Sequence, residues 1–453
     1  MRKFIGVLCS ILAVAIAIVL ILFNPENGLQ LFFDGHTHSP SKPIIENQID
    51  PTCTTEGSYE EVIYCSDPSC GELVTRTTRV VATLPHSYKD GICLVCGINE
   101  RYSKGLEFLS LGNGTCIIKG IGSCADKSIS VPPTSPAGDK VIGVGGYAFE
   151  ANKDIESIIL PDGVEYIEEH AFAGCTNLSS ITIEKSLKRI GNFAFASCAN
   201  LAVIRLPGVE SIGVHAFERC EKLHAVTLGD SLTSIGDFAF QYCDHITNIN
   251  LPDNVASIGR SAFEYCTRLT EITLNASLTF IGDYAFSTCI SVTSIAIPDS
   301  VESIGKGAFS YCYRLADVYI GSTVESIGKD AFYYCEDIEY ISVSAENEGY
   351  KDISGNLYTK DGKTLIKYAV AKQDEAFKIP SGVTTIEPGA FLMSESLTAI
   401  EIPSSVSDIG NEAFGKCFNL VEIRYEGNQS RWEAVTKGED WDLFTGEYIL
   451  IYN

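Results

Sequence analysis

Five cysteines near the N-terminal end of the chain stand at spacings that could hold a metal ion. Cys93 and Cys96 have two residues between them and are followed by Gly97, so two thiolates on one tight turn could bind a tetrahedral Zn²⁺. Cys65 and Cys70 form a looser pair, and the 22 residues between Cys70 and Cys93 are close to the spacing of a zinc ribbon. We therefore predict a structural zinc site made of Cys65, Cys70, Cys93 and Cys96.

Other chemistry stays open for the same segment. Cys53 and His86 are alternative or additional zinc ligands. Outside the cell, disulfide bonds compete with zinc, and the fifth cysteine then stays unpaired unless Cys116 or Cys124 bonds to it. Reactive thiols are a third interpretation. Because no open coordination position is evident, zinc and disulfides both predict a closed, structural site.

The rest of the sequence contains no motif for catalysis. It has no G-x-S-x-G elbow, no H-E-x-x-H helix, no P-loop and no G-x-G-x-x-G after a strand. His170, His215, His224 and His245 fall at variable positions of the repeats described below, and we interpret them as exposed surface residues. We predict no catalytic residues, no cofactor other than structural zinc, and no enzymatic activity.

The charge of the chain excludes one class of partner. Its 453 residues include 33 Lys and Arg against 58 Asp and Glu, which gives a formal net charge of −25. Such a field repels phosphate backbones. We therefore expect no nucleic-acid partner.

The first segment has the length of a membrane span. Residues 4–23 carry no charge and follow Arg2 and Lys3. Twenty residues at 1.5 Å each span about 30 Å, the thickness of a hydrocarbon core. No small-residue cleavage site follows at Asn24. With the two basic residues on the cytoplasmic side, we predict a single-pass cell-membrane protein whose remaining chain is extracellular, and a secreted protein is the alternative.

A period of 23 residues organises most of the chain. Successive steps between the marker cysteines are 22 or 23 residues, Asn152 stands one step earlier, and Ser394 and Cys417 continue the register after a 36-residue insertion. Fixed self-similarity of this kind predicts a solenoid, here with eleven repeats. The markers are Cys175, Cys198, Cys220, Cys243, Cys266, Cys289, Cys312 and Cys335.

Each repeat contains two extended pieces. After Cys266, the L-x-x-I-x-L spacing of Leu269 to Leu274 predicts a short strand with one buried face. Leu278 and Ile281 predict a second short extended piece, after which a glycine breaks the strand and an Ala-Phe pair plugs the interior. Stacked coils, with strands about 4.8 Å apart, would bury these faces in one continuous core.

The repeat L-x-x-I-x-I-P-x-x-V-x-x-I-G-x-x-A-F-x-x-C resembles that of the BspA-type bacterial surface leucine-rich-repeat family over residues 141–425. Residues 106–132 are similar to the β-rich leader of such arrays and residues 423–452 to their C-terminal cap. The cysteine segment resembles a small module found in surface proteins of anaerobic bacteria. The resemblance implies a cell-surface protein concerned with adhesion or interaction, and it implies no catalytic residues.

The insertion, at about residues 345–376, carries a hairpin signal. Asp361 and Gly362 stand between two runs of alternating residues, a pattern typical of a two-residue β-turn. We predict a β-hairpin that projects from one coil. A structural origin is the favoured interpretation, and a dedicated binding loop is the alternative.

The repeat cysteines differ from those of the N-terminal module. Cys packs as a small hydrophobe with a weak S–H donor, and stacked residues in register have parallel Cβ vectors that close disulfides badly. Asn152 and Ser394 replace Cys in this column, which argues against obligatory pairing. We predict mainly free, buried thiols.

Tyrosines provide the candidate binding surface. Four of them precede a repeat cysteine, two stand beside these, and two more lie on the strand face. Stacked coils would bring the first six together as one patch, and tyrosine is common at recognition surfaces. The alternative is that they only cover the turn. The candidates are Tyr242, Tyr265, Tyr311, Tyr334, Tyr313, Tyr333, Tyr319 and Tyr340.

The sequence therefore predicts a β-rich leucine-rich-repeat solenoid with β caps, a small Cys-rich module and an N-terminal transmembrane helix. The leading hypothesis is a surface protein that mediates adhesion by binding an extracellular protein or glycan. The alternative is a structural envelope or stalk protein without a specific ligand. The expected parts are the membrane anchor 1–24, a linker 25–52, the Cys-rich module 53–97, the N-terminal cap 98–140, the solenoid 141–425 and the C-terminal cap 426–453.

Overall fold

The chain divides into two compact units, Met1–Pro85 and His86–Asn453. Within the part that the computed structural model describes, no helix is both long and apolar enough to cross a bilayer. The span predicted at residues 4–23 lies outside that part. The structure describes residues 42, 44–49, 57–64, 73–81, 88–89, 92–93 and 102–453.

The first unit contains a three-stranded antiparallel sheet in the order β1-β2-β3. Its strands are β1 (Ile44–Ile49), β2 (Gly57–Tyr64) and β3 (Leu73–Val81). Arg79 and Glu61 form an ion pair of 3.0 Å between neighbouring strands of this sheet. In the second unit, β4 (Tyr88–Lys89) and β5 (Ile92–Cys93) pair antiparallel before the solenoid begins.

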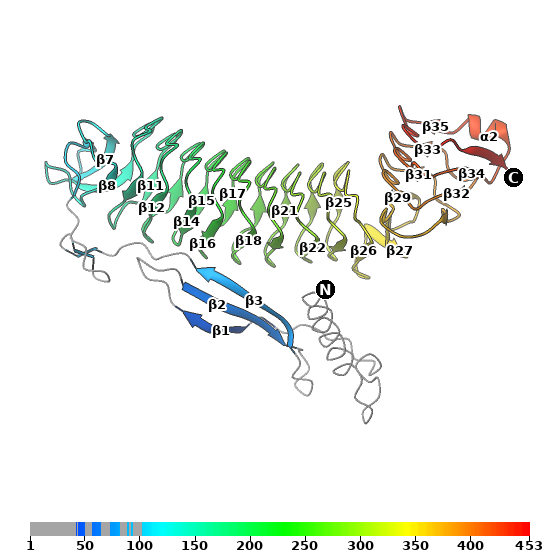
Figure 1. Cartoon of the computed structure of the whole chain (residues 1–453), viewed down its shortest axis with the longest axis horizontal. Helices are drawn as coiled ribbons and strands as arrows, with labels where there is room; N and C mark the ends of the chain where they lie inside the picture. The colour runs from blue at the N-terminus through cyan, green and yellow to red at the C-terminus, as the bar shows by residue number, and fades with distance from the viewer. Residues whose placement is uncertain are drawn as a thin grey trace, which may run out of the picture. The chain divides into compact units, whose positions relative to one another are not determined.

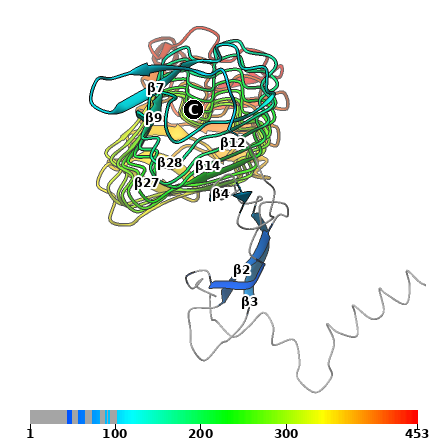
Figure 2. The same ribbon diagram turned by 90° about the vertical axis from the view of Figure 1, so that its left-hand side faces the viewer.

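Most of the second unit is a solenoid whose coils each contribute two short strands. The coils lie side by side in Figure 1, and in the end-on view of Figure 2 they superpose on one another. Parallel pairing joins equivalent residues of successive coils, as for Ile258 and Ile281. The predicted leucine-rich-repeat solenoid is therefore confirmed.

The first strand of each coil alternates between core and solvent. In β24, Val318 and Ile320 are buried, whereas Asp317 and Tyr319 are exposed, because successive side chains of a strand point to opposite faces. These strands form four short parallel sheets rather than one. They are β8 (Ser128–Ser130), β10 (Ser157–Ile159) and β12 (Ser180–Thr182); β14 (Val203–Leu206) and β16 (Ala225–Leu228); β18 (Asn248–Asn250) and β20 (Glu271–Thr273); and β22 (Ser294–Ile297), β24 (Asp317–Ile320) and β26 (Tyr340–Val343).

The second strand of each coil forms the longer ladder, a sheet of 11 strands. All but the first strand pair run parallel, and β6 pairs antiparallel with β7 at the N-terminal end. The strands are β6 (Glu107–Ser110), β7 (Thr115–Gly120), β9 (Lys140–Val144), β11 (Tyr166–Ile167), β13 (Arg189–Ile190), β15 (Ser211–Ile212), β17 (Ser234–Ile235), β19 (Ser257–Ile258), β21 (Phe280–Ile281), β23 (Ser303–Ile304) and β25 (Ser326–Ile327).

A glycine and a phenylalanine explain how tightly the coils stack. A Cβ at Gly282 would lie 2.6 Å from the carbonyl carbon of Gly259 in the preceding coil, so no larger residue fits there. Past this glycine, the Phe N–H of most coils donates to the Ala carbonyl of the next coil, as from Phe263 to Ala285 at 2.8 Å. The Phe rings of nine successive coils, from Phe149 to Phe332, stack with centroids 5.1–5.8 Å apart and fill the core.

The repeat cysteines are buried and free, which confirms the prediction of buried thiols. Each Sγ donates to the carbonyl oxygen of the Phe in the preceding coil, for example from Cys243 to Phe217 at 3.2 Å. Burial raises the pKa of the Cys175 and Cys335 thiols to about 12. The repeat cysteines therefore have a structural role, in which each thiol satisfies a backbone carbonyl group of the preceding coil.

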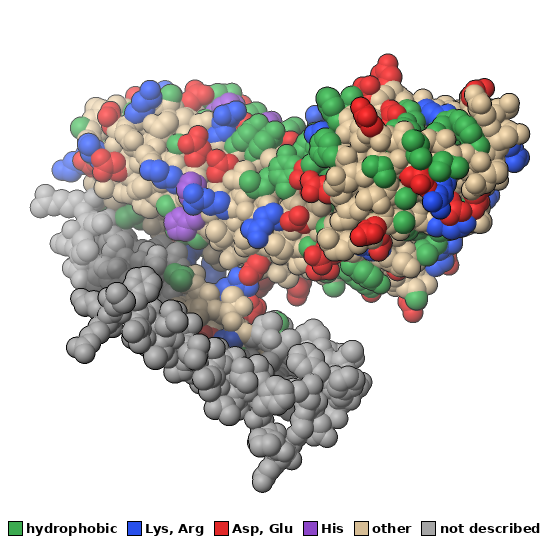
Figure 3. Space-filling view, turned by 45° about the vertical axis from the view of Figure 1, so that its right-hand side comes forward, with side chains coloured by type: hydrophobic (Ala, Val, Ile, Leu, Met, Phe, Trp, Pro, Cys, Tyr) green, Lys and Arg blue, Asp and Glu red, His purple; other side chains and the backbone are tan. Residues whose placement is uncertain are grey.

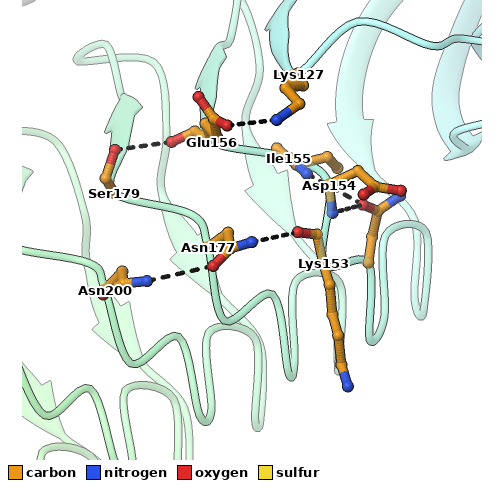
Figure 4. A network of polar contacts seen from close by, with 9 residues as sticks. Lys127, Lys153, Asp154, Ile155, Glu156, Asn177, Ser179 and Asn200 are labelled. Atoms are coloured by element: carbon orange, nitrogen blue, oxygen red, sulfur yellow. Dashed lines mark hydrogen bonds and ion pairs between the residues drawn. The ribbon is translucent and has the colours of Figure 1, made fainter.

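Where Asn152 replaces the first cysteine of the column, its side-chain amide forms hydrogen bonds within the turn. Its Oδ1 accepts hydrogen bonds from the backbone N–H groups of Asp154 and Ile155, at 2.9 and 3.2 Å. In the next coil Asn177 donates to the carbonyl of Lys153 at 2.6 Å. Figure 4 shows these contacts running from coil to coil at the N-terminal end of the array.

The insertion divides the solenoid into two arrays. Strand β25 has no ladder partner on its C-terminal side within the part described, and a new sheet starts at β27, just before the hairpin of β28 and β29. The hairpin does not project from a coil, because β29 pairs in parallel with β31 and so belongs to the ladder. The second array comprises β27 (Tyr350–Ile353), β28 (Asn356–Thr359), β29 (Thr364–Lys367), β31 (Thr385–Ile386), β33 (Asp408–Ile409) and β35 (Thr436–Lys437) in one sheet, β30 (Ala376–Lys378), β32 (Ala399–Ile402), β34 (Glu422–Tyr425) and β36 (Ile449–Tyr452) in the other, and α2 (Gln429–Glu433).

The number of coils exceeds the eleven repeats predicted, since the solenoid has about 15 coils of about 23 residues. Strands β7, β29 and β35 continue the ladders although their coils lack the repeat motif. Backbone hydrogen bonds alone define membership of a ladder, so a search for the motif misses these coils.

Candidate functional site

The tyrosines before the repeat cysteines adopt the left-handed conformation, with φ of 59° at Tyr242 and 61° at Tyr265. Their rings stack on each other with centroids 4.6 Å apart. The Arg219 guanidinium lies over the Tyr242 ring, 4.7 Å from its centroid. Because both of its ring faces are covered, Tyr242 presents mainly its ring edge and its hydroxyl group to solvent.

A second group, which we call the tyrosine cluster, consists of Tyr311, Tyr313, Tyr333 and Tyr334. Tyr311 stacks on Tyr334 with centroids 5.1 Å apart, and its edge-to-face contacts reach Tyr313 at 6.2 Å and Tyr333 at 5.9 Å. Thr288 occupies the intervening coil, so the predicted single patch of six tyrosines is a pair and a cluster.

Within the cluster, Tyr333 is fixed by the second array. Its hydroxyl donates to Glu412 at 2.8 Å, and its ring packs over Gly389, where a Cβ would lie 2.9 Å from the ring. Burial, followed by the hydrogen bond to Glu412, raises the pKa of Tyr333 well above its usual value. Lys416 of the same array lies 4.8 Å from the Tyr334 ring centroid. These contacts join the two arrays, as expected if the tyrosines serve architecture.

Tyr311 and Tyr313 are the more accessible members of the cluster. Their exposed fractions are 36% and 37%. Tyr319 and Tyr340 are similarly exposed on the outer face of β24 and β26, where they are diagonal neighbours in register. Figure 3 shows acidic and basic side chains interspersed over one face of the solenoid, with hydrophobic side chains gathered in its C-terminal part.

A second aromatic column was missed by the sequence analysis. The rings of Tyr147, His170, Phe193, His215 and Phe238 stack on successive coils with centroids 4.5–4.8 Å apart. His170 and His215 are therefore half-buried in a stack, with side-chain exposures of 29% and 23%, and the interpretation of them as exposed surface residues is only partly correct. Each stands immediately before the Ala-Phe pair, the position that Phe takes in alternate repeats, and this shared register was the available signal. His224 is exposed, and His245 is half-buried like His170 and His215.

A cavity of about 330 Å³ lies where the first array ends and the second begins. Its walls come from the turn after β25, from the hairpin and from the segment after β31. The Tyr350 hydroxyl accepts a hydrogen bond of 2.8 Å from the backbone N–H of Ile327, which would otherwise face the gap. The charged lining residues are Lys329, Asp330, Lys367 and Glu387.

The predicted zinc site cannot be placed in this fold. Cys65, Cys70 and Cys96, with the alternates Cys53 and His86, lie outside the described residues, and so does the side chain of Cys93 at the end of β5. Within the described residues, no three or more His, Cys, Asp or Glu side chains come together as a metal site.

Comparison with known proteins identifies the repeat. The BspA type leucine rich repeat region matches residues 142–256, 233–354 and 368–434, which together make up more than half of the chain. The unmatched stretch between the last two ranges contains β28 and β29. No curated protein matches the chain.

Solved structures of leucine-rich-repeat proteins are also similar. One from Bacteroides ovatus is 23% identical, with a TM-score of 0.49 over 77% of this chain and 89% of that one. A leucine-rich cell surface protein from Faecalibacterium prausnitzii is 27% identical, with a TM-score of 0.44 over 74% and 97%. The pneumococcal vaccine antigen PcpA is 19% identical, with a TM-score of 0.42 over 78% and 81%. On the match of the repeat itself, the chain belongs to the BspA-type leucine-rich-repeat family.

Proposed function

We propose that this protein is a cell-surface adhesion or binding protein that recognises an extracellular protein or glycan through the tyrosine cluster. Its family and its repetitive, rigid scaffold support this proposal. The observation that carries it is the exposure of Tyr311 and Tyr313, each more than a third accessible and each held by neighbouring rings. Held tyrosines provide contact area at a low cost in conformational entropy.

The geometry limits how a ligand would be held. The stacked rings of Tyr311 and Tyr334 cover one another, and Lys416 covers part of the cluster. A ligand would therefore meet ring edges and phenolic hydroxyls instead of open ring faces. Hydrogen bonds to the hydroxyls, supplemented by edge contacts, fit a polar protein surface or a glycan chain.

The experiment uses the full chain, solubilised in detergent, on a glycan array and on a panel of purified extracellular-matrix proteins. We expect the double variant Tyr311→Ser and Tyr313→Ser to lose at least tenfold in affinity for the best ligand, with little change in thermal unfolding. Tyr147→Ser is the matched control, because Tyr147 is also exposed (52%) but belongs to the other aromatic column. Retained affinity together with a lower melting temperature would refute the binding role.

A structural envelope or stalk protein is the second candidate. The contact of Tyr333 with Glu412 favours it, because that contact joins the two arrays. Under this alternative no member of the ligand panel binds, and the tyrosine variants change only stability.

We also propose that residues 4–23 anchor the chain in the cell membrane, with the solenoid outside. The uncharged run of twenty residues after Arg2 and Lys3 supports this placement. N-terminal sequencing of protein extracted from membranes tests it. A mature chain that starts near residue 24 or later would show a secreted protein instead.

For the N-terminal module we propose one structural zinc ion bound by Cys65, Cys70, Cys93 and Cys96. The paired cysteine spacing supports it. Elemental analysis of the full chain, purified without chelator, should find about one zinc per chain, and the variant Cys93→Ser with Cys96→Ser should lose it. Oxidised cysteines without zinc would favour disulfides.

A further inference from the structure

Lys367 occupies a position that every regular coil gives to alanine. The Tyr368 N–H donates to the Ala390 carbonyl at 3.0 Å, and the Tyr368 ring stacks on Phe391 with centroids 5.0 Å apart. These are the contacts of the Phe in the Ala-Phe pair, so Lys367 replaces the Ala. The same place is held by Ala148, Ala171, Ala194, Ala216, Ala239, Ala262, Ala285, Ala308, Ala331, Ala390 and Ala413.

The Lys367 side chain is buried and has little to balance its charge. Only 3% of the residue is exposed, and its Nζ donates to the carbonyl oxygen of Gly389 at 3.2 Å. No carboxylate of the described residues lies within ion-pair distance of it, and Glu336, Cys335 and Cys417 act on it only at longer range. Burial lowers the pKa of Lys367 to about 8. Burying an ammonium group without a carboxylate partner lowers the stability of the folded protein. An apolar side chain would therefore be expected at this position.

Both Lys367 and its acceptor Gly389 line the junction cavity. At about 330 Å³, this cavity falls within the range of small-molecule sites. Its other polar side chains come from three elements: Lys329, Asp330 and Tyr333 follow β25, Tyr350, Thr359 and Thr364 belong to the hairpin region, and Glu387 follows β31.

The mixture of groups restricts the chemistry of a ligand. A simple anion would pair with Lys367 but would also face the Asp330 and Glu387 carboxylates. An apolar ligand would leave the buried ammonium unpaired. A carboxylated sugar satisfies both, because its carboxylate can pair with the ammonium while its hydroxyls donate to the acidic side chains and exchange hydrogen bonds with Thr359 and Thr364.

We propose that the junction cavity binds an acidic sugar residue of the uronic-acid type, with its carboxylate on the Lys367 ammonium and its hydroxyls on Asp330, Glu387 and the threonines. This inference rests on the proposed function, according to which the protein binds glycans. It places the acidic sugar in the cavity, apart from the exposed edges of Tyr311 and Tyr313.

The test measures binding of D-glucuronate to the full chain in detergent by calorimetry. D-glucose and acetate are the comparison probes, since each carries half of the required chemistry. We expect glucuronate to bind at least tenfold more tightly than either. The affinity should fall as the pH rises above about 8, because the deprotonated amine no longer attracts a carboxylate.

Lys367→Met keeps an unbranched side chain and removes the charge. We expect it to weaken glucuronate binding at least tenfold while the protein stays folded, as its melting temperature will show. Lys363→Met is the matched control, because Lys363 lies on the same hairpin with 67% of its side chain exposed and should leave binding unchanged. Glucuronate binding that equals glucose or acetate binding, or that survives Lys367→Met, overturns the proposal.

The two proposals fail in different ways. If Tyr311→Ser with Tyr313→Ser abolishes ligand binding on the arrays and Lys367→Met leaves glucuronate binding intact, the proposed function stands and the cavity assignment falls. If glucuronate binds in a manner that depends on Lys367 but the tyrosine variants lose nothing, the cavity is a site and the tyrosine surface is not.

Discussion

The Cys266 thiol donates a hydrogen bond of 3.3 Å to the carbonyl oxygen of Phe240, 26 residues earlier and one coil back. The same contact recurs down the column, up to Cys417 and Phe391 at 3.1 Å. At each repeat cysteine one small side chain thus satisfies a buried carbonyl, whereas the buried hydroxyl of Ser394 in the same column has no hydrogen-bond partner.

Removing this hydrogen bond should destabilise the array. We expect Cys266→Ala to lower the free energy of unfolding by about 1–2 kcal/mol, because a buried acceptor loses its donor. Cys266→Ser should cost at least as much, because its shorter side chain would also leave a buried hydroxyl unpaired, as at Ser394 in the same column. Urea unfolding followed by circular dichroism provides the comparison, and an unchanged stability of Cys266→Ala would contradict the hydrogen-bonding role.

The column thiols should resist alkylation in the native protein. Burial raises the pKa of Cys175, Cys335 and Cys417 to about 12, so at pH 8 these thiols are protonated as well as inaccessible. Iodoacetamide treatment at pH 8, followed by peptide mass mapping, should leave them unmodified until urea is added. Labelling of these three peptides in the native state at the rate seen in urea would be inconsistent with the buried column.

The His215 ring should contribute to stability although histidine usually lies at the surface. Phe193 and Phe238 cover its two faces at 4.5 Å. We expect His215→Ala to cost about 1–2 kcal/mol of unfolding free energy through lost ring contacts. The exposed His224 provides the control, and His224→Ala should change stability by less than about 0.5 kcal/mol. Thermal unfolding at neutral pH measures both, and similar values would show that the stack contributes nothing.

Lys367 makes stability depend on pH in a direction opposite to that of a paired lysine. Its pKa in the folded state is about 8, below the ordinary value of 10.5. The unfolded chain therefore binds the proton more tightly, and between these two pH values stability rises with pH. The expected slope from this group is about 1 kcal/mol per pH unit.

Chemical unfolding at pH 7, 8 and 9 measures that slope. Lys367→Met should be the more stable protein at pH 7, and its advantage over the natural chain should shrink at pH 9. An advantage that stays constant across this range would mean that Lys367 is not buried as an unpaired amine.

The sequence alone determined the repeating unit. One period governs the cysteine steps, the Ala-Phe pairs and the L-x-x-I-x-L spacing. Equivalent side chains of the regular coils therefore pack against each other in the same way. Burial of Cys266 and of Ile281 followed directly, because a side chain that recurs at each coil can be buried only by its own copies. Family membership rests on the same residues.

Only the tertiary structure decided what happens where the pattern stops. Nothing local marks Lys367 as the counterpart of an alanine; its place follows from the backbone hydrogen bond between Tyr368 and Ala390. The stacking of His170 and His215 likewise depends on the distance between coils. Each histidine considered alone in the sequence is expected at the surface. The cavity exists because β25 ends one ladder before β29 begins the next. The burial of a repeated side chain follows from the period of the sequence. The structure of an interruption depends instead on which backbone groups form hydrogen bonds with each other there.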